Sequence, residues 1–160
     1  MSDPTGTPEQ HAEASASWRS DRPRPGAPEV QLTVPLDSLR ALSRVRRRVQ
    51  AFLLSSLGPG VDQQVAEDVV ERAVLVIDEL ASNALRHGDQ PADLSIADTT
   101  EGWTVTVTDS APGRPPAPAR ERPAGQGGYG LYVITDLTTA HGVQYEPDRK
   151  LVWACITKTP

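Results

Sequence analysis

Residues 79–87 read Glu-Leu-Ala-Ser-Asn-Ala-Leu-Arg-His and close a long segment with helical periodicity. Asp62 is the candidate N-cap of this segment, and Gly88 sits where a glycine C-cap is expected. Between them, apolar residues recur at helical spacing and predict one buried stripe: Val65, Val69, Ala73, Val76, Ile77, Leu80 and Ala84. The segment therefore predicts a single long helix that ends at about His87.

The polar edge of this helix carries candidate chemistry. Glu79, Asn83 and His87 follow one another at four-residue intervals, so they share one face. The carboxamide oxygen of Asn83 suits Mg²⁺, which takes hard oxygen ligands and keeps several waters. Glu79 is placed to accept a proton from an attacking hydroxyl or water. The alternative is an ordinary solvated shoulder, with His87 serving as a C-terminal cap.

A second candidate group, Asp109, follows the predicted strand 103–108. An ionised carboxylate only accepts hydrogen bonds, so a buried one would suit the exocyclic amine of adenine. Gly113, four residues later, would let the backbone approach a planar base. The alternative is an Asx-type turn that closes the strand.

A glycine run precedes a predicted helix at about residues 129–139. The run comprises Gly125, Gly127, Gly128 and Gly130. Exposed N–H groups at a helix start bind phosphate, and glycine permits a close approach. The pattern is not a Walker loop, because no Lys-Ser/Thr pair follows the glycines. A flexible, glycine-rich hinge is the alternative.

The remaining chain predicts the fold class. Residues 1–28 are rich in Pro, Ser, Glu, Gly and Arg, which predicts a disordered tail with Trp18 as an isolated apolar residue. The alternative is that Trp18 is a docking anchor for a partner. A strand at 30–34 precedes a helix that Asp37 or Ser38 caps and that ends at about Leu57. Further strands are predicted at 94–97, 103–108, 143–145 and 151–157. Helices come mostly first and strand pairs later, so we expect an α+β two-layer sandwich with a mostly antiparallel sheet.

Composition excludes several classes. With 160 residues, one domain is the default, and the single cysteine excludes an intramolecular disulfide. A net charge of −5 argues against direct nucleic-acid binding, although the first helix carries five arginines: Arg40, Arg44, Arg46, Arg47 and Arg48. We expect those arginines to form a solvated or partner-contacting face. No apolar run is long enough to cross a bilayer, so a cytoplasmic protein without a membrane partner is expected.

In this order, the motifs resemble those of the GHKL ATPase superfamily, which includes gyrase, histidine kinases and the large heat-shock chaperone. The chain is most similar to small bacterial serine/threonine kinases that act as anti-sigma factors. The resemblance covers residues 29–158 and would make them one ATP-binding kinase domain. Glu79 and Asn83 match the N box, Asp109 and Gly113 the G1 box, and Gly128-Tyr129-Gly130-Leu131 the G2 box.

The resemblance implies a Bergerat-type ATP-binding fold, with helices covering one face of the sheet, and a role for each matched residue. Glu79 would be the general base, and Asn83 would hold Mg²⁺. Residues 114–127 would form a lid over the nucleotide. The residues expected to contact ATP are Asn83, His87, Asp109, Gly113, Gly128, Tyr129, Gly130 and Leu131.

The resemblance also implies a function and partners. It predicts an ATP- and Mg²⁺-dependent serine/threonine kinase that acts as an anti-sigma factor in a partner-switching system. Its partners would be an anti-anti-sigma factor-like protein, a sigma factor, or both, and a homodimer would form through the first strand or helix. The family's G1 pattern is Asp-x-Gly-x-Gly, and Ala111 replaces the first glycine here. That departure motivates the alternative of a non-catalytic ATP-binding module that sequesters a partner.

Overall fold

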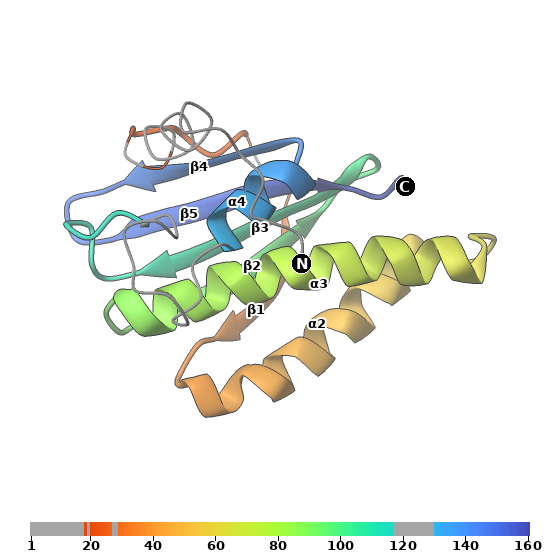
Figure 1. Cartoon of the computed structure of the whole chain (residues 1–160), viewed down its shortest axis with the longest axis horizontal. Helices are drawn as coiled ribbons and strands as arrows, with labels where there is room; N and C mark the ends of the chain where they lie inside the picture. The colour runs from red at the N-terminus through yellow and green to blue at the C-terminus, as the bar shows by residue number, and fades with distance from the viewer. Residues whose placement is uncertain (1–17, 19, 27–28, 117–129) are drawn as a thin grey trace, which may run out of the picture.

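A five-stranded antiparallel sheet forms one layer of the molecule (Figure 1). The computed structural model describes residues 18, 20–26, 29–116 and 130–160. The strands follow the spatial order β1-β2-β3-β5-β4, and all neighbouring pairs are antiparallel. Their bounds are Val30–Pro35 for β1, Asp93–Asp98 for β2, Gly102–Asp109 for β3, Ala140–Tyr145 for β4 and Lys150–Thr157 for β5.

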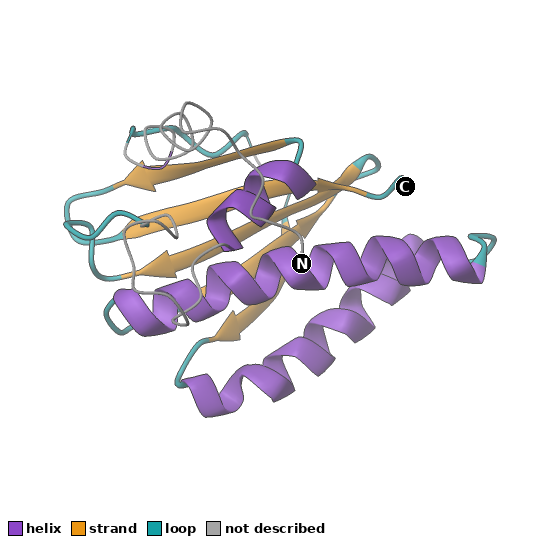
Figure 2. Cartoon of the chain, in the orientation of Figure 1, coloured by secondary structure: helices purple, strands orange, loops and turns teal. Residues whose placement is uncertain are grey.

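The helices cover one face of this sheet and form the second layer (Figure 2). Their bounds are Leu42–Leu57 for α2, Gln63–His87 for α3 and Gly130–Leu137 for α4, with a short 3-10 turn, η1, at Leu39–Ala41. Side chains alternate across β3, so that the fully buried Val105 and Val107 lie on the helix side while Thr104 and Thr108 lie on the outer side. The predicted α+β two-layer sandwich is confirmed.

Helix α3 begins and ends as predicted, but its C-terminal glycine is needed for an unexpected reason. The Asp62 carboxylate accepts hydrogen bonds from the backbone N–H groups of Gln64 and Val65, at 3.0 and 3.2 Å. Gly88 is the C-cap with φ −93°, a conformation open to any residue. A Cβ built on Gly88 would lie 2.6 Å from Cγ of Asp109, so it is space that requires glycine here.

The start of α2 differs from the prediction. Neither Asp37 nor Ser38 caps it through a side chain: Ser38 is the N-cap of η1 and makes no side-chain capping hydrogen bond. The 3-10 turn leads directly into α2, so the first helical turn is built from backbone groups instead. The predicted apolar stripe is nevertheless present, with Val45, Val49 and Leu53 buried.

The described part of the N-terminal region packs against the edge strand β4. Trp18 is fully buried. The Arg22 backbone N–H donates to the carbonyl of Val143 at 2.7 Å, and the Trp153 indole N–H donates to the carbonyl of Arg22 at 2.9 Å. The prediction of Trp18 as an isolated apolar residue is wrong, because the sheet edge supplies a hydrophobic site that local composition does not reveal. Residues 1–17 lie outside the described part, and the domain boundary at residue 29 stays a prediction.

Among the described residues, no helix combines the length and the apolar character needed to span a membrane. The longest, α3, buries one apolar face and presents the acidic residues Glu67, Asp68 and Glu71 to solvent. This pattern is typical of a helix that packs on a sheet.

Candidate nucleotide-binding site

The C-terminal ends of α3 and β3 meet at one corner of the molecule. Gly88, at the end of α3, is in close contact with the Asp109 side chain at the end of β3. The Ser110 N–H donates to the carbonyl of Asp89 at 2.9 Å, and the Ser110 hydroxyl donates to the carbonyl of Pro91 at 3.0 Å. The structure therefore brings the C-terminal end of α3 next to the strand-end acid, although the sequence separates Gly88 and Asp109 by more than 20 residues.

Asp109 is a buried carboxylate with two donors on one oxygen. Only 1% of the surface of Asp109 is exposed to solvent. Oδ1 accepts from the Lys150 ammonium at 2.8 Å and from the Ala111 backbone N–H at 2.8 Å. The Ala111 bond is the Asx-type turn considered as an alternative, and it leaves Oδ2 of Asp109 without a part in that turn. An ion pair and a backbone donor together offset the cost of burying the charge.

Lys150 was not among the site residues predicted from the sequence. It is the first residue of β5 and is only 2% exposed. Its ammonium also donates to the carbonyl of Ala111 at 3.0 Å. In the sequence it follows a Pro-Asp-Arg turn and resembles an exposed lysine of that turn. Only its pairing with Asp109 in the β3–β5 register would have indicated that it is buried. That register is a tertiary property.

Asp109, Lys150 and Tyr145 lie side by side on neighbouring strands, because Lys150 pairs with Asp109 of β3 and with Tyr145 of β4. Burial raises the pKa of the Tyr145 phenol, and the carboxylates of Asp21 and Asp109 raise it further. The phenol is therefore neutral at physiological pH, and its O–H donates to the carbonyl of Trp18 at 3.1 Å. Tyr145 thus connects the N-terminal segment at Trp18 with the strand that carries Lys150.

The G1 departure at Ala111 carries no conformational strain. No described residue other than glycine adopts a positive φ, so Ala111 takes a backbone conformation that any L-residue can adopt. Its methyl group is buried. Gly113 differs: a Cβ built there meets no heavy atom within 4 Å. The structure thus leaves open space beside Gly113, in keeping with its expected role next to a base.

Glu79 and Asn83 are half-buried on α3, and His87 is exposed in its last turn. The Ser82 hydroxyl donates to the Glu79 carbonyl at 3.4 Å. In the described ranges no three His, Cys, Asp or Glu side chains gather as a metal centre. The amide oxygen of Asn83 still fits Mg²⁺, since this ion uses few protein ligands and completes its shell with phosphate and water.

The phosphate-binding prediction is only partly within the described residues. Gly128 and Tyr129 lie outside them, as does the lid from residue 117 onwards. Gly130 and Leu131 form the start of α4, which packs on α3. Within the described start of the lid, Arg114 forms an exposed ion pair with Asp89 at 3.3 Å.

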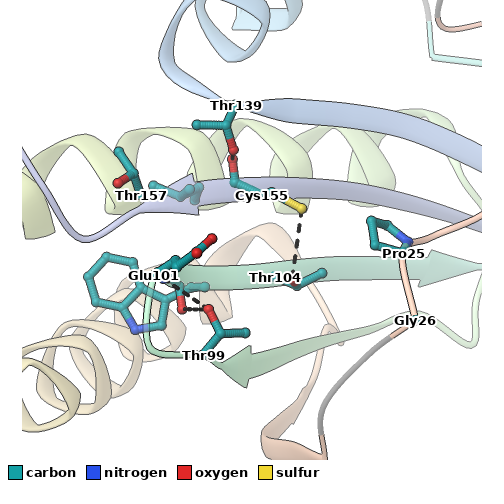
Figure 3. Close-up of a pocket in the computed structure, with 11 residues that line it drawn as sticks. Pro25, Gly26, Thr99, Glu101, Thr104, Thr139, Cys155 and Thr157 are labelled. Carbon is teal, nitrogen blue, oxygen red and sulfur yellow. Dashed lines mark hydrogen bonds between the residues drawn. The ribbon is translucent and has the colours of Figure 1, made fainter.

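A separate pocket of about 360 Å³ lies on the outer face of the sheet (Figure 3). Thr104 and Cys155 lie side by side in its wall, and Pro25 and Gly26 close one side. Asp109 and the helices occupy the opposite face. This pocket is therefore distinct from the candidate nucleotide site.

Comparison with known proteins gives a family match. The sequence model described as histidine kinase-like ATPase domain matches residues 37–156. Curated protein sequences give no match. Among solved structures, the Acinetobacter baumannii histidine kinase AdeS is similar over 95% of this chain and 77% of that chain, with 12% sequence identity and a TM-score of 0.42.

Proposed function

Since the chain belongs to the histidine kinase-like ATPase domain family, we propose that it is a serine/threonine kinase that uses ATP and Mg²⁺ to phosphorylate a protein partner. The observation that carries the proposal is the contact between the end of α3, which bears Glu79 and Asn83, and the buried Asp109. In this proposal, α3 and the end of β3 would together supply a proton acceptor, a hard oxygen ligand and a hydrogen-bond acceptor for a base.

Each residue has a role in this proposal. Asn83 would hold Mg²⁺, and the bound ion would neutralise charge on the phosphates. Asp109 accepts a hydrogen bond from the adenine amine. Glu79 accepts the proton of the attacking serine or threonine hydroxyl, and backbone amides at the start of α4, from Gly130 and Leu131, hold phosphate oxygens. Phosphoryl transfer needs mainly positioning and charge stabilisation, so this set is chemically sufficient.

The proposed partners follow from the family resemblance. We propose that the substrate is an anti-anti-sigma factor-like protein and that the chain holds a sigma factor when that protein is absent. Helix α2 offers a basic docking surface, since Arg44, Arg47 and Arg48 are exposed while Arg46 pairs with Asp78 of α3 at 2.8 Å. β1 is an edge strand, and it would be the place of a homodimer contact.

The test is phosphoryl transfer from labelled ATP to a panel of anti-anti-sigma factor-like proteins from the same organism. Glu79→Gln should lower transfer by about 100-fold or more while leaving the Kd for ATP within about threefold, because a general base acts on the chemical step. Asp78→Asn is the matched control: it neutralises the preceding α3 carboxylate, which faces α2, and should transfer phosphate normally.

Two outcomes would contradict the kinase proposal. Normal ATP binding with no transfer to any of these proteins would leave a non-catalytic module that sequesters a partner. Unchanged transfer by Glu79→Gln would remove the proposed base. The structure gives Ala111 no strained conformation, so the G1 departure by itself does not favour the non-catalytic alternative.

A further inference from the structure

The buried lysine at the start of β5 has no role in the proposed reaction so far. We propose that Lys150 is a positioning residue that sets the preference of the site for a base with an exocyclic amine, acting through Asp109. This inference rests on the proposed ATP-binding function. It adds a specificity determinant that lies outside the matched motifs, 41 residues beyond Asp109.

The geometry ties Lys150 to two parts of the site at once. Its ammonium donates to Oδ1 of Asp109 at 2.8 Å and to the carbonyl of Ala111 at 3.0 Å. Ala111 in turn donates its N–H to the same carboxylate oxygen. The three groups form a closed ring of hydrogen bonds, so that the lysine fixes both the carboxylate and the loop that follows it.

Burial makes this ring more than a surface ion pair. The Lys150 and Asp109 side chains are 3% and 1% exposed. A charged group removed from water persists only when a counter-charge and hydrogen bonds replace its hydration. Oδ1 already accepts two donors, and Oδ2 lies 2.7 Å from the position that a Cβ on Gly88 would take. The carboxylate is thus held by two donors on Oδ1, and the end of α3 leaves no room for a side chain beside Oδ2.

The consequence for a ligand is chemical. A carboxylate paired with an ammonium is ionised and can only accept hydrogen bonds. The exocyclic amine of adenine donates, whereas the keto oxygen of guanine accepts and would face a second acceptor. Lys150 therefore favours an amine-bearing base, because its ammonium fixes the Asp109 carboxylate and the Ala111 carbonyl in place.

The other end of β5 supplies a matched control. Lys158 forms an ion pair with Asp98, a strand-end carboxylate, and donates to the carbonyl of Thr99 at 2.7 Å. In both places a lysine ammonium contacts a strand-end carboxylate and donates to a backbone carbonyl that follows it in the sequence. The Lys158 pair lies at the end of the sheet away from Asp109, and its two side chains are 16% and 22% exposed.

The experiment measures two dissociation constants with Mg²⁺, for ATP and for purine riboside triphosphate, which is ATP without the amine. The unsubstituted chain should prefer ATP by about tenfold or more, since a hydrogen bond to a charged group is worth about that factor. Asp109→Asn, Lys150→Met and the double variant should all fall to a preference of about threefold or less. Lys158→Met should keep the full preference.

The double variant makes the test independent of folding losses in Lys150→Met. It leaves no unpaired buried charge, and its comparison with Asp109→Asn asks whether Lys150 acts through Asp109. If it does, adding Lys150→Met to Asp109→Asn changes the preference by less than about twofold. A further loss in the double variant, or a full preference in a folded Lys150→Met, would overturn the inference. No ATP binding by the unsubstituted chain would instead refute the proposed function itself.

Discussion

The two ends of β5 carry the same local arrangement in different surroundings. At one end Lys150 pairs with Asp109 and with the carbonyl of Ala111, and at the other Lys158 pairs with Asp98 and with the carbonyl of Thr99. The first pair is almost fully buried and lies against the end of α3. The second is partly exposed, and Lys158 lies 5.7 Å from the centre of the Trp103 ring.

Burial, rather than the set of partners, separates a structural ion pair from a candidate functional one. The Lys158 and Asp98 side chains are 16% and 22% exposed, so solvent screens their charges more and that pair mainly fastens the end of the sheet. Lys150 and Asp109 are buried too deeply for water to replace a lost partner. A fold that keeps a buried charge beside its candidate nucleotide site gains a rigid acceptor whose orientation does not depend on solvent.

The largest effect is expected from breaking the buried pair. Lys150→Met should lower the free energy of unfolding by about 3 to 5 kcal/mol, because it leaves a buried carboxylate without its counter-charge. Urea denaturation of both proteins at pH 7 checks this. The Lys150→Met/Asp109→Asn variant should recover part of the loss, and equal instability of both variants would mean that volume rather than charge is responsible.

A smaller effect is expected at the contact between α3 and Asp109. Gly88→Ala should cost about 1 to 3 kcal/mol, since its Cβ would lie 2.6 Å from Cγ of Asp109 and 2.7 Å from the Ala84 carbonyl. It should also weaken ATP binding, because Asp109 must shift. Thermal unfolding and ATP titration measure the two effects.

Gly113→Ala is the control for that substitution. A Cβ at Gly113 meets nothing within 4 Å, and its φ is not positive, so stability should change by about 0.5 kcal/mol or less. Equal stability losses for the two alanine variants would show that the contact with Asp109 is not the cause.

A smaller loss of stability than that of Gly88→Ala is expected at the partly exposed end of β5. Lys158→Met should cost about 1 kcal/mol or less, in keeping with a solvent-screened ion pair. A denaturation midpoint close to that of the unsubstituted chain would sustain the contrast between the two ends. A loss as large as that of Lys150→Met would erase it.

Local signals predicted the helix that carries the site. The apolar period of α3, the Asp62 cap and the glycine at its end are properties of neighbouring residues, and the structure confirms each of them. The same kind of signal failed at Ser38, where a capping side chain was predicted and backbone groups suffice. It also failed at Trp18, whose burial depends on the edge of β4, more than 100 residues away.

The sequence by itself determined the polar edge of α3 and the position of Asp109 at a strand end, because helical and strand periods are set by adjacent residues. Only the tertiary structure decided that Lys150 meets Asp109. That contact depends on the register of β3 against β5, in which a shift of one residue would turn the lysine to the opposite face. Register is set by packing of the whole sheet against the helices, and no short stretch of sequence contains it.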